Sequence, residues 1–169
     1  MPDERSDTVF LGWLDRHGPI VLKVARAYTR SAADCQDLAQ DILLQLWRSA
    51  PRFEGRAGEA TWVYRVALNT ALGWHRKESR RLARQRPLVD VEGPDRGQDP
   101  AQREAVERLY TAIRRLPEPD VALVLLYLDD LSYRQIAEVL GMSESYVGVR
   151  LTRARKALAE LLREDDCGP

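Results

Sequence analysis

Apolar residues recur every three or four positions along most of the chain, which is the period of an amphipathic α-helix. The clearest such stripe lies in residues 144–162 and consists of Val147, Leu151, Ala154 and Leu158. Before it, Ser132 and Gln135 have the spacing of a capping box, and Gly141 suits the left-handed residue that ends a helix. A short helix, a glycine turn and a longer basic helix predict a helix-turn-helix, which places its second helix in the DNA major groove. A plain helical hairpin with a solvated basic face is the alternative for this stretch alone.

The same periodicity predicts helices on both sides of one irregular segment. Residues 87–100 contain prolines, glycines and acidic residues without apolar periodicity, so we expect a flexible acidic linker there. This linker separates a domain at residues 1–86 from a second domain at residues 101–169. Expected helices span about 8–18, 19–28, 32–50 and 61–84 in the first domain, and about 101–116, 121–128, 133–140 and 144–162 in the second. The sequence therefore predicts an all-α protein of two small helical domains.

Local signals set the expected ends of the N-terminal helices. Gly18-Pro19 is expected to end the first helix and to begin the second. Ser31 and Asp34 are candidate caps for the third helix, and Thr61 is one for the fourth. One stripe of the fourth helix is expected to face the other three: Val63, Val66, Ala67, Thr70 and Trp74. The acidic tail at 164–169 is expected to fray.

The formal net charge is zero, from 26 Lys and Arg and 26 Asp and Glu, but the two signs are segregated along the chain. Basic residues dominate positions 73–86, whereas acidic residues dominate the linker and the end of the tail. Such blocks indicate polyanion-binding surfaces separated by an acidic spacer. The two cysteines, Cys35 and Cys167, lie far apart, which indicates neither a zinc site nor a disulfide framework. No apolar run has the character of a signal peptide or a membrane span, so we expect a cytoplasmic protein without membrane insertion.

One face of the helix expected at 61–84 carries residues suited to single-stranded nucleic acid. Trp62, Arg65 and Asn69 share this face at spacings of three and four, beside a glycine-containing loop that carries Phe53. Bases stack on aromatic rings, and an amide can read a base edge. Packing is the alternative, because a tryptophan at helical spacing is often a core residue. We favour function for Arg65 and Asn69, and packing for Trp74.

The helix expected at 32–50 has a mixed face beside its apolar stripe. That face consists of Asp37, Gln40, Asp41, Leu44 and Arg48. An exposed leucine among acidic and amide groups indicates either a partner-docking surface or a solvated face with one stray leucine. The residues alone leave both interpretations open.

Catalytic, cofactor-binding and metal-ligating patterns are absent from the sequence. His17 and His75 have no nucleophile or carboxylate at a telling spacing, and no glycine-rich phosphate loop occurs. We therefore expect neither an enzyme nor a bound cofactor.

Several of these stretches resemble one protein family. Residues 37–41 (Asp-Leu-Ala-Gln-Asp), 52–55 (Arg-Phe-Glu-Gly) and 61–69 (Thr-Trp-Val-Tyr-Arg-Val-Ala-Leu-Asn) resemble conserved region 2 of bacterial sigma factors of the extracytoplasmic-function (ECF) group. Residues 116–118 (Leu-Pro-Glu) and 131–158, which end in Arg-Ala-Arg-Lys-Ala-Leu, resemble region 4. The two stretches occur in the family's order and are joined by a linker of the family's kind.

The resemblance implies a promoter-specificity subunit that binds core RNA polymerase, recognises the −35 and −10 promoter elements and stabilises promoter melting. Its implied partners are core RNA polymerase, promoter DNA and an anti-sigma factor. The implied −35 residues are Ser145, Tyr146, Val149, Arg150, Arg153 and Lys156, and the implied −10 residues are Phe53, Gly55, Arg56, Trp62, Arg65 and Asn69. The implied contact with the polymerase consists of Asp37, Gln40, Asp41, Leu44 and Arg48. Basic side chains that can hold the adjoining DNA backbone are Arg76, Lys77, Arg80 and Arg81.

The sequence departs from the family at one place. Gly148 and Val149 stand where family members often place a basic residue and a serine. Neither residue can donate a bidentate hydrogen bond to a base, so −35 readout falls to Tyr146, Arg150 and Arg153, with Val149 available for a thymine methyl group. A free-standing helix-turn-helix regulator is the main alternative function, and an interaction protein with no direct role on DNA is the second.

Overall fold

The computed structural model describes residues 4–84, 99–166 and 168. These residues form α-helices and one short 3-10 helix, which confirms the all-α prediction. The chain divides into two compact units, residues 1–93 and 94–169. The predicted linker at 87–100 falls at this division, and most of it lies outside the described residues.

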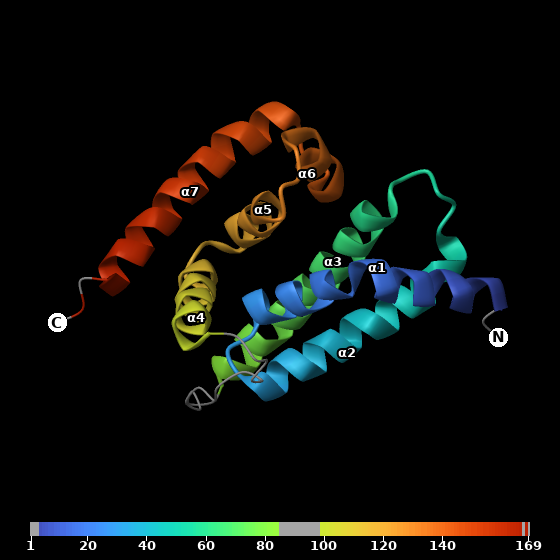
Figure 1. Ribbon diagram of the computed structural model, residues 1–169, viewed down its shortest axis with the longest axis horizontal. Helices are drawn as coiled ribbons and strands as arrows, with labels where there is room; N and C mark the ends of the chain where they lie inside the picture. Colours follow the sequence, from blue (N-terminus) through green and yellow to red (C-terminus); the bar gives the residue numbers. More distant parts are fainter. Residues whose placement is uncertain (1–3, 85–98, 167, 169) are drawn as a thin grey trace. The chain divides into compact units, whose positions relative to one another are not determined.

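Three long helices of the first unit pack against one another (Figure 1). They are α1 (Glu4–Tyr28), α2 (Ala32–Ser49) and α3 (Glu59–Leu82), and the 3-10 helix η1 (Ala50–Arg52) follows α2. Their shared core contains Trp13, Val24, Leu38, Ile42, Leu46 and Val63. Of the two candidate caps of α2, Ser31 occupies the N-cap position, and its Oγ accepts a hydrogen bond from the backbone N of Asp34 at 3.1 Å.

The prediction of two helices before residue 28 was wrong. α1 is a single helix that continues through Pro19. A proline lacks the N–H of the helical hydrogen bond and crowds the preceding turn, which is why a break was expected. However, Trp13, Ile20 and Val24 lie on one helical face, and all three are buried. Burial of this continuous face favours one helix over two.

The start and the inward face of α3 also differ from the prediction. The helix begins at Glu59, before the predicted cap Thr61, and Gly58 occupies the N-cap position. Its buried residues include Val63, Tyr64, Ala67, Leu68 and Ala71. Of the predicted stripe, Val66, Thr70 and Trp74 are only half-buried. Apolar residues occupy several faces of this segment, so periodicity alone could not select the one that packs on α1 and α2.

The second unit contains four helices among its described residues: α4 (Pro100–Arg114), α5 (Glu118–Leu128), α6 (Tyr133–Leu140) and α7 (Glu144–Asp166). α7 contacts each of the other three helices. Every residue of α5 from Asp120 to Leu126 is buried, so this helix forms the centre of the unit, as its apolar sequence predicts. The helices predicted for this half of the chain are confirmed, with small shifts at their ends.

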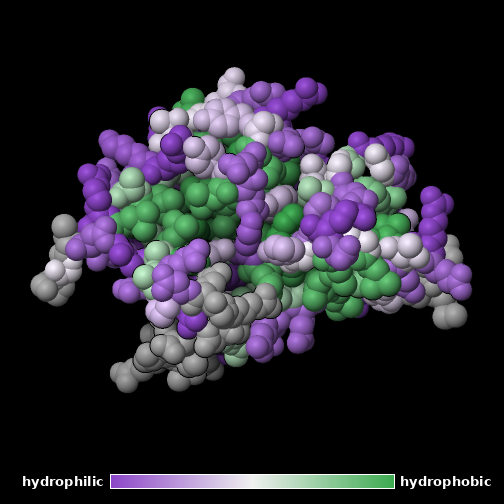
Figure 2. Space-filling model, in the orientation of Figure 1, coloured by the Kyte–Doolittle hydropathy of each residue, from purple (hydrophilic) through white to green (hydrophobic). Residues whose placement is uncertain are grey.

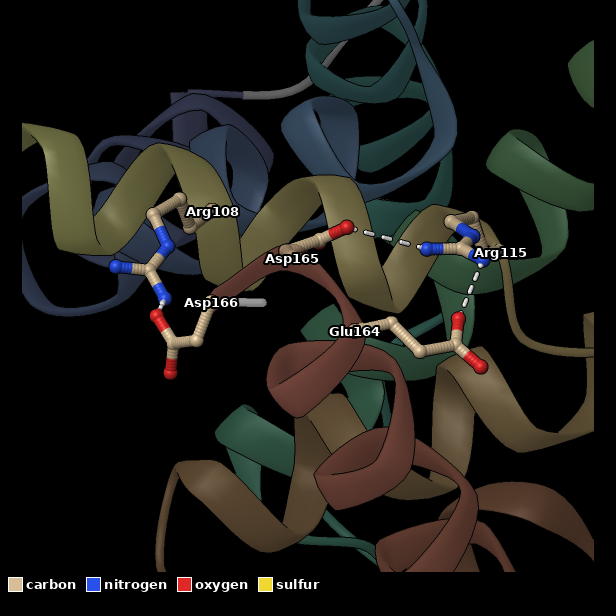
Figure 3. A network of polar contacts seen from close by, with 5 residues as sticks. All are labelled: Arg108, Arg115, Glu164, Asp165 and Asp166. Atoms are coloured by element: carbon tan, nitrogen blue, oxygen red, sulfur yellow. Dashed lines mark hydrogen bonds and ion pairs between the residues drawn. The ribbon is translucent and has the colours of Figure 1, made fainter. Parts of the chain in front are cut away.

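The acidic end of α7 is helical as far as Asp166, contrary to the predicted fraying from residue 164, whereas residues 167 and 169 of the predicted tail lie outside the described residues. The helix continues to Asp166, and its last turn makes ion pairs with Arg108 and Arg115 at α4 (Figure 3). An Nη atom of Arg115 lies 3.0 Å from Glu164, and the other lies 3.3 Å from Asp165. Opposite charges brought together from the two ends of this unit hold the last turn in place.

Candidate nucleic-acid interface

The turn between α6 and α7 has the geometry that its sequence predicts. Oγ of Ser132 accepts a hydrogen bond from the Gln135 backbone N at 3.2 Å, and the Gln135 side chain accepts one from the Ser132 N at 2.8 Å. Gly141 ends α6 in the left-handed region, with φ of 67°. Ser143 then caps α7, since its Oγ accepts a hydrogen bond from the Tyr146 N at 3.2 Å. These bonds define a helix-turn-helix.

α7 presents two opposite faces. Its buried face is the predicted stripe of Val147, Leu151, Ala154 and Leu158. The opposite face is exposed and includes Ser145, Tyr146, Val149, Arg153 and Lys156, together with Thr152. Val149 is 58% exposed and lies near the centre of this face. The structure therefore brings all the predicted −35 residues except Arg150 to one surface.

Arg150 lies at the edge of that surface and is bound within the protein. Its Nε donates a hydrogen bond to Oδ1 of Asp120 at 2.7 Å, and one Nη donates to the Tyr146 hydroxyl at 3.1 Å. Asp120 stands in the first turn of α5 and is buried. The hydrogen bond with Asp120, and then that with Tyr146, raises the pKa of Arg150 above its ordinary value. Arg150 therefore joins the exposed helix to the centre of the unit.

Tyr133 covers the opposite edge of α7. A Cβ atom added to Gly148 would lie 3.5 Å from Cε2 and 3.7 Å from Cδ2 of Tyr133. The Tyr133 ring thus lies beside the backbone of Gly148. Tyr133 nevertheless remains 40% exposed, so it borders the surface formed by α7.

In the first unit, aromatic contacts hold the predicted −10 loop, residues 53–58, against α1 and α3. The Phe53 ring makes edge contacts with Trp13 and Trp62, with ring centroids 5.2 Å and 5.6 Å apart. Nε1 of Trp62 donates a hydrogen bond to Oγ of Ser49 at 3.1 Å. Phe53 and Trp62 are half-buried, so part of each ring supports the fold. The sequence favours base stacking for these rings, with packing as the alternative for tryptophan, and the contacts of both rings agree with packing.

The other predicted −10 residues lie at or near the surface. Gly55 has a φ of 72°, which places the loop in a conformation that glycine favours. Arg56 is exposed and pairs with Glu54 at 2.8 Å. On α3, Asn69 is exposed and Arg65 is half-buried. The loop and this part of α3 thus offer polar groups to a ligand.

The C-terminal half of α3 forms a basic surface. Lys77, Arg80, Arg81 and Arg84 line a pocket of about 500 Å³, and Arg76 is also exposed. An Nη of Arg81 lies 2.7 Å from the Glu78 carboxylate. The hydrogen bonds that Arg81 donates to Glu78, together with the negative charge of Glu78, raise the pKa of Arg81 above the ordinary value. The pocket can hold an anion such as a DNA phosphate.

The mixed face of α2 is exposed, as predicted. Asp37, Gln40, Asp41, Leu44 and Arg48 all lie outside the core. The Leu44 residue is 42% exposed, whereas Leu38, Ile42 and Leu46 on the same helix are almost fully buried. The α2 surface, defined by these five exposed residues, is therefore separate from the helical core.

Comparison with known proteins identifies the family. The Sigma-70 region 2 family matches residues 13–81, and the Sigma-70, region 4 family matches residues 106–158. The RNA polymerase sigma-H factor of Pseudomonas aeruginosa is 32% identical, over 85% of this chain and 83% of that protein. The ECF RNA polymerase sigma-E factor of Haemophilus influenzae is 33% identical, over 80% of this chain and 79% of that protein.

The chain belongs to the ECF sigma factors. Two solved structures share the fold of this sigma factor. RpoE in complex with the anti-sigma factor NepR, from Bartonella quintana, has a TM-score of 0.72 at 22% identity, over 91% of this chain and 96% of that chain. CnrH in complex with the cytosolic domain of CnrY has a TM-score of 0.67 at 23% identity, over 92% and 88%.

Membership of the family gives the function of this sigma factor. It is a promoter-recognition subunit of RNA polymerase, and the alternative of a free-standing regulator is not favoured. None of the helices in the described part of the chain is long and apolar enough to cross a membrane. Over the same residues, no group of three or more His, Cys, Asp or Glu side chains could hold a metal ion.

The sequence alone does not predict two residues that support the helix-turn-helix surface of this sigma factor, Asp120 and Tyr133. Asp120 lies thirty positions before its partner Arg150, so no local spacing connects the two. Tyr133 follows the cap of α6 and was interpreted only as the first helical residue. In the sequence, only Gly148 indicates the position of Tyr133, because a glycine on α7 leaves room for an aromatic ring from α6.

Proposed function

We propose that the two units of this sigma factor read two promoter elements, with residues 1–86 acting on the −10 element and residues 101–169 on the −35 element, on either side of the linker at 87–100. The observation that carries the proposal is the pair of opposite faces on α7. One face closes the core of the unit, and the other exposes Ser145, Tyr146, Val149, Arg153 and Lys156. A helix held in this way can enter a major groove with its exposed face toward the bases.

In the first unit, the loop at 53–58 and the N-terminal half of α3 form the proposed −10 site. Asn69 and Arg65 would contact an unstacked base from α3, and Gly55 and Arg56 would contact it from the loop. Extruding a base costs on the order of a few kcal/mol, which contacts in a shaped site can offset. Phe53 and Trp62 contribute by holding the loop against Trp13, and any stacking uses the part of each ring that remains exposed.

The basic end of α3 is the proposed anchor for the DNA backbone. Arg76, Lys77 and Arg80 would neutralise phosphates, and Arg81 would do so while paired with Glu78. Phosphate contacts of this kind release bound cations, so they weaken as the salt concentration rises. They would hold the strand in register for the −10 site without reading its sequence.

The α2 surface is the proposed contact with core RNA polymerase. Leu44 supplies an apolar centre, and Asp37, Asp41 and Arg48 supply charges around it, which is the usual composition of a protein interface. The sigma factor would act in the cytoplasm, where the polymerase carries out the chemistry. An anti-sigma factor is a further proposed partner, supported by the solved complex of RpoE with the anti-sigma factor NepR.

Run-off transcription on a library of random promoters tests the proposal. Purified core RNA polymerase is assayed with and without the full chain, and the transcribed promoters are sequenced. We expect chain-dependent transcripts that share two upstream motifs at a fixed spacing. Selective duplex binding by the chain alone, without any transcripts, would contradict the proposal and favour a free-standing regulator.

A further inference from the structure

Within the second unit, exposed large apolar side chains are concentrated on the helix-turn-helix. Hydrophobic residues show at several places on the face drawn in Figure 2, so exposure of a single one identifies no site. In the described part of the second unit, however, three of the four large apolar residues that are exposed belong to α6 and α7. They are Tyr133, Tyr146 and Val149, exposed by 40%, 47% and 58%. We call these three residues the apolar reading surface.

The two residues next to Val149 in the sequence leave its side chain uncovered. Gly148 has no side chain, and the Tyr133 ring fills the space beside it. Arg150 donates its Nε–H to the buried Asp120 and one Nη–H to Tyr146, which reduces the donors left for a base. Val149 projects between these two positions, directly opposite the buried stripe of α7. Val149 is therefore the apolar centre of a face that also exposes Ser145, Arg153 and Lys156.

Charge around the apolar reading surface indicates a polyanion rather than an apolar protein partner. Arg134 on α6 and Arg153 and Lys156 on α7 are all exposed. Basic side chains around an apolar centre suit duplex DNA, because the phosphates flank the groove and the base edges lie between them. The occupant that fits both the charge and the shape is a major groove.

Within the major groove, one base offers an apolar group. Thymine presents its 5-methyl group there, whereas the other base edges present hydrogen-bond donors and acceptors. We infer that the apolar reading surface recognises thymine in the −35 element through this methyl group, with Val149 as the central contact. This inference rests on the proposed −35 role of α7 and adds the chemistry of the base that it reads.

Replacement of thymine by deoxyuridine tests the inference, because it removes only the methyl group. The promoter selected by run-off transcription is synthesised with deoxyuridine at each −35 thymine in turn. The equilibrium dissociation constant of the reconstituted holoenzyme is measured on each duplex. We expect binding to weaken by about three- to five-fold at one or two positions, which corresponds to the loss of one buried methyl group.

Variants of the full chain assign the effect to this surface. Val149→Ala should bind the thymine promoter about as weakly as the wild type binds the deoxyuridine promoter, and should no longer distinguish the two. Tyr133→Ala should reduce the discrimination, because the apolar reading surface loses one of its three members. Leu128→Ala is the matched control, since Leu128 is 46% exposed in the same unit but lies outside α6 and α7. It should keep the wild-type discrimination.

Two results would overturn the inference while leaving the proposed function intact. One is chain-dependent transcription in which the holoenzyme binds thymine and deoxyuridine equally at every −35 position. The other is discrimination that Val149→Ala retains in full, with circular dichroism showing that the variant is folded. Failure of the proposed function would look different, because no chain-dependent transcripts would be obtained at all.

Discussion

Two glycines of the helix-turn-helix differ in backbone conformation, since Gly141 is left-handed and Gly148 is helical. Gly141 ends α6 with φ of 67°, a region that a side chain makes costly. Gly148 lies within α7, where glycine is the less favourable choice because it leaves more freedom in the unfolded chain. The same substitution should therefore have opposite effects at the two positions.

Gly148→Ala should stabilise the sigma factor by about 0.5–1 kcal/mol, from helix propensity. The added methyl group would meet Tyr133 at 3.5 Å, which is an ordinary contact distance. Gly141→Ala, the matched comparison, should lower the free energy of unfolding by about 1–2 kcal/mol. Urea denaturation followed by circular dichroism measures both changes. A loss of stability in Gly148→Ala would show that the space beside Tyr133 is already full.

The ion pair between Arg150 and Asp120 is expected to stabilise the second unit. Arg150→Met keeps most of the side-chain length but leaves the buried Asp120 without its partner, so it should destabilise the fold by about 1.5–3 kcal/mol. The double variant with Asp120→Ala should lose less than the sum of the two single variants. Strict additivity in urea denaturation would contradict the coupling.

Among the helices, α1 contains a destabilising residue in its interior, Pro19. Pro19 interrupts the hydrogen-bond ladder of a long helix, and only the buried face of that helix compensates for it. Pro19→Ala should therefore raise the free energy of unfolding by about 1–3 kcal/mol. Pro51→Ala is the control, because Pro51 occupies an early position of η1, where proline costs little. Equal effects from the two substitutions would contradict this explanation.

Local signals predicted most helix ends, whereas packing decided the rest. Ser31, Ser132 and Gly141 act within a few residues of their own position, so the sequence could indicate them. The continuation of α1 through Pro19 depends on a core assembled from three helices. The inward face of α3 depends on the same core, because its apolar residues are not confined to one stripe.

The same distinction between local signals and packing applies to the candidate site. The exposed faces of α2 and α7 could be predicted from periodicity, since polar residues recur opposite a buried stripe. The pairing of Arg150 with Asp120 could not, because it joins two helices through residues thirty positions apart. Likewise, the contact of Phe53 with Trp13 joins a loop to a distant helix, and it shows that the Phe53 ring serves packing.

In the whole molecule, polymerase binding and strand capture are proposed to use different surfaces, the α2 surface for the first and the −10 site for the second. Leu44→Arg should weaken binding to core RNA polymerase by about ten-fold or more, as expected for the loss of an interface anchor, because it places a charge at the centre of the α2 surface. Asn69→Ala should leave that affinity unchanged but impair open-complex formation, since it removes the amide from the proposed −10 site. Fluorescence anisotropy measures the first property, and permanganate footprinting measures the second. Unchanged promoter melting in Asn69→Ala would contradict the strand-capture role.

The acidic last turn of α7 also affects how the whole molecule meets nucleic acid. Glu164, Asp165 and Asp166 lie against Arg108 and Arg115, so part of the positive charge of the second unit is already neutralised by the chain itself (Figure 3). A chain that ended before this turn would carry an excess of basic residues instead of a balance. It would adhere to DNA of any sequence more strongly at low salt. We therefore expect these built-in counterions to limit binding to DNA outside promoters.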